Sequence, residues 1–404
     1  MKQMKKVLLL LVVCVVLMAS LCGCGNQSEK LTLNVYNWGE YISDGSEDSL
    51  DVNEEFENYC RDELGMEVSV NYTTYASNED MYNKLKSGSA TYDVVIPSEY
   101  MIEKMIAEDM LSPLDFSNIP NYQYIDEDFK NLFFDPENTY SVPYTYGMVG
   151  VIYNSEMVAE EDLGSWDLLW NDTYKGQILQ FNNPRDAFGT AIYWAEDSVN
   201  STDPAVWQSA VEKLKAQKPL IQSYVMDEIF NKMKNGSAAI APYYAGDFLT
   251  MYDSNDLLGF YYPEEGTNVF VDAMCVPACA KNKELAEIYI NFMLEKEIAI
   301  ANAEYIGYAS PHRLVREDEE YIAYMQDWHE DAMEILYAEN SAVKTEYYES
   351  LDTQTLTLQN SLWETLKIEN AVEPWIYITA GTIVGALILF FLYSYFLKRY
   401  RNHY

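Results

Sequence analysis

The sequence predicts an α/β protein built of two lobes, and three observations support that fold class. The chain has 404 residues, which is enough for two domains of ordinary size. Apolar patterns of strand and helix period alternate from residue 31 to about 115, as in a mostly parallel sheet. A similar alternation with different spacing occupies 177–294. Two such lobes bind a ligand between them, at the carboxyl ends of their strands.

The elements of the first part follow from apolar spacing and from residues that begin or end helices. Leu31, Leu33 and Val35 alternate as in a strand, whereas apolar residues in 52–64 recur at helical spacing and Gly65 closes that helix. The other predicted elements are a strand at 68–72, a helix capped by Asn78 and ending at Gly88, a buried strand at 93–96 and a helix that begins at Ser98.

The second part is read in the same way, and no repeat or low-complexity tract interrupts it. Its predicted elements are a strand at 177–181, helices at 184–195, 207–216 and 226–234, strands at 238–241 and 269–274, and a helix at 284–294.

The amino-terminal segment 1–24 predicts export. Lysines precede an apolar run at 7–18, and small residues follow, which is the pattern of a secretory signal. The end of this segment, Leu21-Cys22-Gly23-Cys24, resembles the lipobox of bacterial lipoproteins. The resemblance implies that Cys24 carries a lipid anchor.

A second hydrophobic segment, 375–397, predicts a transmembrane helix. It holds no charged residue over roughly 23 positions, which is roughly 34 Å as a helix. Aromatic residues flank it, and the basic tail 398–404 follows, which places the carboxyl terminus in the cytoplasm. The body between the two hydrophobic segments is therefore expected on the extracytoplasmic face of a bacterial cell membrane. Whether a lipid on Cys24 and this helix both anchor the chain stays open, as does the role of the helix.

The composition limits the kinds of ligand and cofactor that the protein is expected to bind. The net charge is −38, and without the signal and the tail 20 basic residues face 64 acidic ones. Such a surface repels nucleic acid and favours cationic ligands. Cys60, Cys275 and Cys279 remain in the body; a bridge between the last two is one alternative, and two buried thiols beside a strand are the preferred one. No spacing of Cys and His predicts zinc, and no cofactor is expected.

Several motifs occur in a fixed order along the chain: LTLNVYNWGEYIS, TTYASNEDMYNKLKSGSATYDVVIPSEYMIEKM, YSVPYTYGMVGVIYN, SWDLLWNDTYKGQIL, FVDAMCVPACAKNKELAEIYINFML and EYIGYASP. Over roughly 31–350 they resemble the spermidine/putrescine-binding proteins of ABC transporters. The resemblance implies a type II periplasmic-binding-protein fold with a crossed hinge near Tyr144 and Asp272. The lobes it implies are 31–144 with 273–316, and 145–272 with 317–370.

The resemblance also implies a site in which carboxylates bind ammonium groups and rings cover the methylenes between them. The residues it implies are Trp38, Glu40, Tyr41, Ser98, Tyr100, Asn183, Asp186, Tyr243, Phe270, Asp272 and Tyr308. Asn183 stands where studied spermidine binders have an acid, which puts the length or number of amines recognised in doubt. A polyamine demands both features: a carboxylate per ammonium, worth about 4 kcal/mol at 4 Å before desolvation, and aromatic faces.

Some of these residues have structural alternatives. Asn183 and Asp186 also form a good helix start around a proline, and Ser98 can serve as a helix cap. Tyr100, Tyr243 and Phe270 can be plain packing, and Arg185 could neutralise its neighbour Asp186. Asp272 follows apolar residues and would be an unusual core residue unless paired.

The sequence thus predicts a monomeric solute-binding component that captures spermidine or putrescine and delivers it to the permease subunits of an ABC importer. One alternative is the same fold with another ligand, such as an amino-acid-like amine or a sugar. Another is a membrane-anchored polyamine sensor or adhesion module. An enzyme is the weakest alternative, because three histidines and no nucleophile–base pairing leave little for catalysis. The preferred polyamine stays open.

Overall fold

The computed structural model describes residues 30–46, 49–338, 343–368, 381–383 and 385–394. The first part of the chain forms β1 (Leu31–Trp38), α2 (Val52–Asp62), β2 (Val68–Tyr75), α3 (Asn78–Lys86), β3 (Val94–Val95) and α4 (Glu99–Ala107). The middle forms β4 (Ser141–Asn154), β5 (Ile178–Phe181), α5 (Pro184–Trp194), α6 (Pro204–Gln217), β6 (Ile221–Val225), α7 (Glu228–Lys234), β7 (Ile240–Tyr244), α8 (Ala245–Tyr252) and β8 (Leu258–Tyr261).

The last part returns to both halves of the molecule. It forms β9 (Thr267–Cys275), α9 (Lys283–Met293), α10 (Lys296–Ile306), α11 (Arg313–Arg316), α12 (Glu319–Trp328), α13 (Ala332–Leu336), β10 (Thr345–Tyr347) and α14 (Thr353–Ile368). Short 3-10 helices lie in the connections at 116–129 and 160–174.

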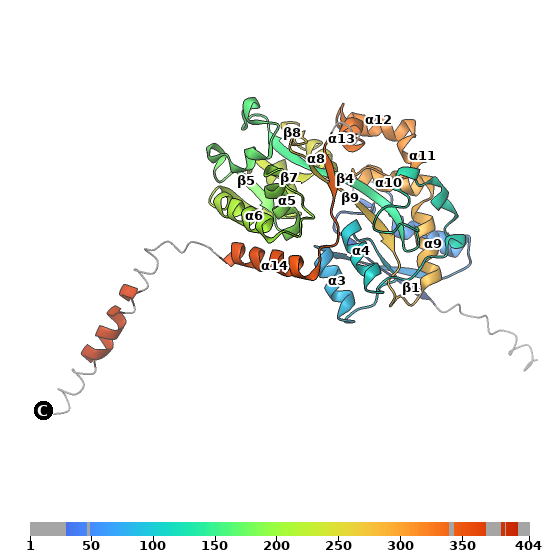
Figure 1. Ribbon diagram of the computed structural model, residues 1–404. Coiled ribbons are helices and arrows are strands. Elements are labelled where there is room, and N and C mark those ends of the chain that lie inside the picture. Colours follow the sequence, from blue (N-terminus) through green and yellow to red (C-terminus); the bar gives the residue numbers. More distant parts are fainter. Residues whose placement is uncertain (1–29, 47–48, 339–342, 369–380, 384, 395–404) are drawn as a thin grey trace, which may run out of the picture.

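The sheet runs in the order β2-β1-β3-β9-β4-β7-β5-β6, with parallel wings and an antiparallel centre. β1 pairs in parallel with β2 and β3, and β5 pairs in parallel with β6 and β7. Between these wings, β4 and β9 pair antiparallel, and they cross the middle of the molecule in Figure 1. The predicted two-lobed α/β fold is confirmed.

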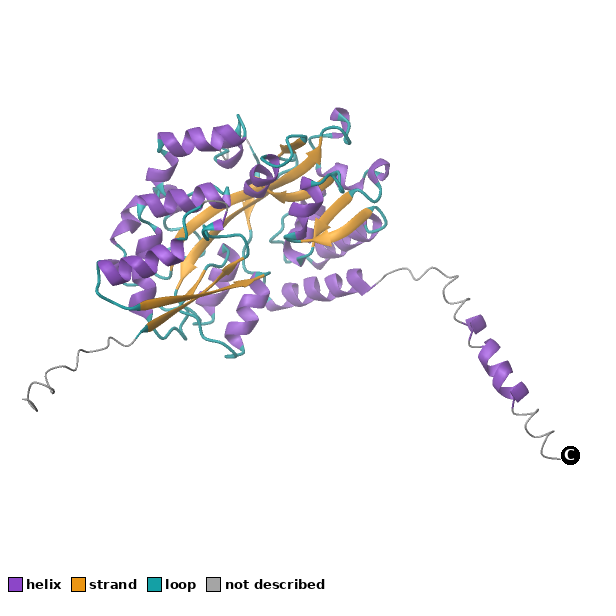
Figure 2. Ribbon diagram, turned by 180° about the vertical axis from the view of Figure 1, so that it is seen from behind, coloured by secondary structure: helices purple, strands orange, loops and turns teal. Residues whose placement is uncertain are grey.

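Separate hydrophobic cores stabilise the two halves. One core is built around β4, β5 and β7 and includes Trp166, Phe188 and Trp207. The other half has one cluster around Leu33, Phe56 and Tyr289 and a second on the opposite side of its sheet. Figure 2 shows the two groups of strands and helices with the central strands between them. Because each half buries its own apolar surface, the junction between them is free to hold polar groups.

The predicted elements of the parallel wings are present, with shifted ends. The predicted cap of α3 is wrong: Ser77, not Asn78, precedes the helix and accepts from the backbone N–H of Asp80. The predicted strand at 238–241 is displaced to Ile240–Tyr244. The central strand β4 was not predicted as a strand, because Pro143 lies inside it; the β4–β9 register shifts between Pro143 and Thr145, where a bulge accommodates the proline.

The cysteines correct a second expectation. Cys60 and Cys275 are buried free thiols, but Cys279 is free and exposed, so the prediction of two buried thiols in 275–279 is wrong for one of them. Cys279 lies in the turn after β9, beyond the end of the buried strand. Burial raises the pKa of the Cys60 thiol to about 11, which keeps it protonated.

The two predicted membrane segments fall wholly or partly outside the described residues. The signal 1–24, with Cys24, lies outside them, as do 375–380, 384 and 395–397 of the predicted transmembrane segment and the tail 398–404. Within the described ranges, no helix has the length and apolarity needed to cross a membrane.

The strand ends of the two wings meet at the junction between the halves. β1 ends at Trp38 and β3 at Val95 in the first half, and β5 ends at Phe181 and β7 at Tyr244 in the second. Because the carboxyl ends of parallel strands lie at one edge of a sheet, the segments that follow all four strands face the same space.

Candidate functional site

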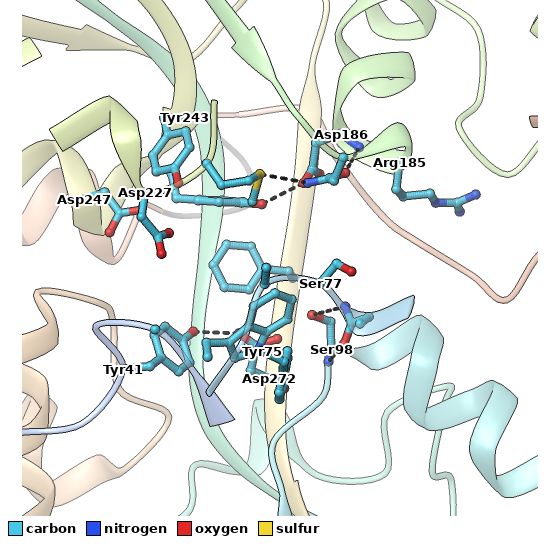
Figure 3. Close-up of a pocket in the computed structure, with 18 of the residues that line it drawn as sticks. Tyr41, Tyr75, Ser77, Ser98, Arg185, Asp186, Asp227, Tyr243, Asp247 and Asp272 are labelled. Carbon is cyan, nitrogen blue, oxygen red and sulfur yellow. Dashed lines mark hydrogen bonds between the residues drawn. The ribbon is translucent and has the colours of Figure 1, made fainter. Parts of the chain in front are cut away.

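A cavity of about 930 Å³, a volume that includes open solvent at its mouth, lies between the two halves. Segments that follow β1, β3, β5 and β7 line it, together with residues of β9 and the loop after α10. All eleven residues of the predicted site line this one cavity: Trp38, Glu40, Tyr41, Ser98, Tyr100, Asn183, Asp186, Tyr243, Phe270, Asp272 and Tyr308. Figure 3 shows several of them with their side chains directed toward one another. Their part in binding stays a prediction.

The segment after β1 forms one wall. The indole N–H of Trp38 donates to the carbonyl of Ile96 at 3.0 Å, and its ring lies 4.7 Å from that of Tyr75. This hydrogen bond uses the only donor of the indole, so the ring serves as apolar surface. Glu40 has a φ of 52°, an uncommon conformation for glutamate that places an acid at the mouth of the cavity.

The halves approach each other closely at Gly39. A Cβ on this residue would lie 3.1 Å from the Oδ2 atom of Asp227, which comes from the segment before α7 in the other half. A residue without a side chain therefore lets an acid of the second half approach the first.

Asp272, on β9, is a buried carboxylate of the cavity with one oxygen hydrogen-bonded and the other without a partner. Its side chain is only 4 % exposed, and Tyr41 donates to its Oδ2 atom at 2.6 Å, while the Tyr41 hydroxyl also lies 2.5 Å from that of Thr145. The Oδ1 atom has no partner. Burial raises the pKa of Asp272 to about 6, against the opposing effects of the neighbouring Ser98 hydroxyl and of the Tyr41 hydrogen bond. One oxygen is thus fixed by tyrosine, and the other is free to accept from a ligand.

At the start of α5, the helix cap and the cavity wall are formed by the same residues. Asn183 accepts from the backbone N–H of Asp186 at 2.9 Å, and its amide donates to the Oδ2 atom of Asp186 at 2.6 Å. Tyr244 donates to the same oxygen at 2.6 Å. Burial raises the pKa of Asp186. Because the Asn183 oxygen is used by the backbone, Asn183 orients Asp186 rather than replacing the missing acid.

The alternative that Arg185 neutralises Asp186 is not what the geometry shows. The Arg185 side chain extends away from Asp186 in Figure 3. Its Nη2 atom donates to Asn200 and to the carbonyl of Glu349, and within the described ranges no ion pair joins it to Asp186.

Aromatic rings form a continuous lining between the carboxylates. The ring of Tyr308 lies 5.4 Å from that of Tyr41 and 5.8 Å from that of Phe270, and Phe270 lies 5.4 Å from Tyr244. Tyr243 stacks on a core ring at 5.4 Å, so it both packs and lines the cavity. These faces provide the apolar and quadrupolar surface that suits an alkyl chain carrying positive charges.

The wall on the side of α3 and α4 is a hydrogen-bonded chain. The amide of Asn78 donates to the hydroxyls of Ser98 and Tyr100 at 3.0 and 3.1 Å, and Tyr100 donates to Glu79 at 3.1 Å. Ser98 occupies the cap position of α4 but makes no capping hydrogen bond, so its hydroxyl faces this chain instead. Burial raises the pKa of Glu79.

Sequence reasoning missed several acids of the cavity, and Asp247 is the most informative. Tyr308 donates to its Oδ2 atom at 2.8 Å, and burial, together with the nearby charges of Asp227 and Glu40, raises its pKa to about 7. The signal was present, since Asp247 follows a predicted strand by a few residues and β7 ends at Tyr244. The other missed acids are Glu79, Glu99 and Asp227.

The acids are spread across the cavity rather than gathered at one point. In Figure 3, Asp227 and Asp247 lie on one side, Asp186 lies on the other, and Asp272 lies below and between them. Within the part of the chain that the structure describes, no three His, Cys, Asp or Glu side chains could together hold a metal ion. Two lobes around a cavity of carboxylates and rings define a protein that binds a small solute.

Comparison with known proteins gives the family. The chain belongs to the bacterial extracellular solute-binding proteins, whose family model matches residues 89–334. It is 34 % identical to the spermidine/putrescine-binding periplasmic protein of Salmonella typhimurium, over 80 % of this chain and 92 % of that one. It is 28 % identical to a putrescine-binding periplasmic protein of Escherichia coli, over 71 % and 79 % of the two chains. This is a family of binding proteins, and the chain is not an enzyme.

Solved structures give the same picture. A spermidine/putrescine ABC transporter protein of Listeria monocytogenes, described as putative, has a TM-score of 0.74 at 35 % identity, over 83 % of this chain and 99 % of that one. A spermidine/putrescine substrate-binding protein of Streptococcus pneumoniae has a TM-score of 0.66 at 36 % identity, over 84 % and 99 %. Neither likeness extends over the whole of this chain.

Proposed function

We propose that this protein captures a polyamine, spermidine or putrescine, between its lobes and delivers it to the permease of an ABC importer. The observation that supports this proposal best is the unpartnered Oδ1 atom of the buried Asp272 among the rings of Tyr41, Phe270 and Tyr308. A buried carboxylate with a free oxygen is costly until a cation binds it. The relatives named for spermidine and putrescine make a polyamine the cation to test first.

The distribution of charge supports an elongated ligand with ammonium groups at intervals. Asp227 and Asp247 would hold one end, Asp272 a position between the ends, and Asp186 the other end. Glu79 lines the same cavity and interacts electrostatically with Asp186, so it would serve that end too. Each ammonium group would meet a carboxylate, and each methylene run would meet a ring. The close approach of Asp227 to Gly39 supports closure of the lobes around the ligand, which excludes water and strengthens each contact.

The division of the chain into lobes is part of this proposal. We assign 31–144 with 273–316 to the first lobe and 145–272 with 317–370 to the second, with the crossings near Tyr144 and Asp272. The pairing of Thr145 with Asp272 beside the β4 bulge supports a hinge at this level. The cores largely follow this division, which supports it, but Ala299, Ala303, Ala309 and Val315 of the assigned first lobe pack in the core of the second.

Membrane attachment completes the proposal. We infer that Cys24 carries a lipid, that 375–397 spans the membrane and that 398–404 lies in the cytoplasm, with the body outside as a monomer. The large apolar side chains of 387–393 are about half or more exposed, which supports a lipid environment for this segment. Mass spectrometry of the mature amino terminus, with protease accessibility of the tail in intact cells, tests both anchors. An unmodified Cys24 together with an external tail would contradict this topology.

Calorimetry tests the ligand. Spermidine and putrescine titrated into the full-length protein in mild detergent should bind at micromolar concentration or tighter, and a panel of neutral sugars should not bind. Binding of a sugar, with no polyamine binding below about millimolar, would instead support the same fold with a different ligand.

A further inference from the structure

A second cavity, of about 600 Å³, lies behind one wall of the candidate site. Glu79, Tyr100 and Arg185 line both cavities and so form the wall that separates them. The rest of the second cavity is formed by α3, α4 and the segment from Glu349 into α14. Nothing in the proposed polyamine site requires this space.

Arg185 brings a buried positive charge with unused donors to this wall. Its side chain is 6 % exposed, and its guanidinium lies 5.7 Å from the ring of Tyr100 and 4.6 Å from that of Tyr348. The Nη2 atom donates to Asn200 at 2.8 Å and to the carbonyl of Glu349 at 3.0 Å. The Nε and Nη1 atoms have no partner. The two rings hold the guanidinium in place but offer these nitrogens no acceptor.

A second buried donor lines the same cavity from α14. Gln359, on α14, is 2 % exposed, lines only the second cavity, and its Nε2 atom has no partner. Buried donors in proteins almost always have acceptors, and a hydrogen bond of this kind left unmade destabilises the folded protein. Two buried side chains, on α5 and α14, therefore bring unused donors to the lining of one cavity.

The chemistry of the lining indicates the kind of acceptor. A carboxylate suits both a guanidinium and an amide donor. Glu79 and Glu349 also line the cavity, so a singly charged anion is favoured over a doubly charged phosphate. Lys104, a further lining cation, is already bonded to Glu108 at 2.7 Å.

We propose that this second cavity is a binding site for a small carboxylate, held by Arg185 and Gln359, and that its occupation strengthens polyamine binding. The coupling rests on the proposed function of the first cavity and acts through charge. Arg185 is next to Asp186 in the chain, and its positive charge opposes the burial that raises the pKa of Asp186 and of Glu79. A carboxylate bound to Arg185 cancels that charge and leaves the first cavity more negative.

The test uses acetate as the probe and the full-length protein in mild detergent. Spermidine affinity is measured by calorimetry in sodium chloride and in sodium acetate at equal ionic strength. We expect roughly fivefold tighter binding in saturating acetate, at the lower end of ordinary coupling between sites. Gln359→Leu and Gln359→Glu should bind spermidine with the same affinity in the two salts. Arg61→Gln, which removes an exposed arginine on α2, should still bind spermidine more tightly in acetate than in chloride.

A second readout separates this proposal from the first one. Acetate alone, without polyamine, should raise the melting temperature of the wild-type protein more than that of Gln359→Leu. If acetate does so while no polyamine binds, the second site stands and the proposed function fails. If spermidine binds equally in both salts and acetate has no effect that depends on Gln359, the cavity holds water only and the proposal is overturned.

Discussion

Replacing Asp272 by asparagine should weaken polyamine binding and stabilise the empty protein at the same time. The variant keeps the shape of the side chain and removes the charge. The raised pKa, from 3.8 to about 6, means that the folded protein holds the ionised group at a cost of about 3 kcal/mol at neutral pH. An ammonium that reaches the free Oδ1 atom would offset that cost, so we expect affinity to fall about 100-fold.

The assay for Asp272→Asn combines two measurements. Calorimetry with spermidine gives the affinity, and thermal unfolding without ligand gives the stability, both near pH 7.5. Asp327→Asn, an exposed change on α12 that removes the same charge, serves as the control and should alter neither. Unchanged affinity in Asp272→Asn, or weaker binding accompanied by a lower melting temperature, would refute the assignment of Asp272 as an ammonium partner.

Three further predictions concern the rest of the cavity. Trp38→Ala should weaken spermidine binding about tenfold or more, because it removes a ring that is fixed by its hydrogen bond to Ile96. Trp38→Phe should retain most of the affinity. Equal losses of affinity in the two variants would argue that the ring does not pack against the ligand. Binding should weaken as pH falls from 8 to 5, since the raised pKa values of Asp247 and Asp272, about 7 and about 6, imply that protons leave these carboxyls when a cation binds. Calorimetry in buffers of different ionisation enthalpy should register that release, and a pH-independent affinity would contradict it. Asp247 and Asp272 should also make the empty protein less stable as pH rises from about 4 to 7, because the folded state binds more protons at these two carboxyls than the unfolded state does; the buried His312, whose pKa is lowered to about 4, acts in the opposite direction. The fall in melting temperature should therefore be smaller in Asp272→Asn than in the wild type, and an equal fall in both would count against the raised pKa of Asp272.

Most of the parallel wings could be predicted from sequence because their signals are local, although β6 (Ile221–Val225) was not predicted. Alternating and helical apolar spacings indicated β1 and α2, and short buried runs indicated β3 and β5. The centre could not be predicted in the same way. β4 contains a proline, and its strand geometry depends on pairing with β9, more than 100 residues away in the chain, which no local pattern records.

The residues of the candidate site could be predicted where a motif specified their positions. Residues outside those motifs were harder to predict. The resemblance implied Tyr243 at the end of β7, and both Tyr243 and its neighbour Tyr244 line the cavity. Tyr244, which was not predicted, donates to Asp186 and contacts Phe270. Asp247 was missed although it follows a predicted strand, because it lies outside the motifs that indicated the other residues.

The central claim is that paired carboxylates and rings between the lobes bind a polyamine. The most direct measurement is a calorimetric titration of the full-length protein with spermidine and putrescine, repeated in two buffers of different ionisation enthalpy. The account predicts binding at micromolar concentration or tighter, with release of protons from the carboxyls of the cavity. No binding of either polyamine below about millimolar would contradict it.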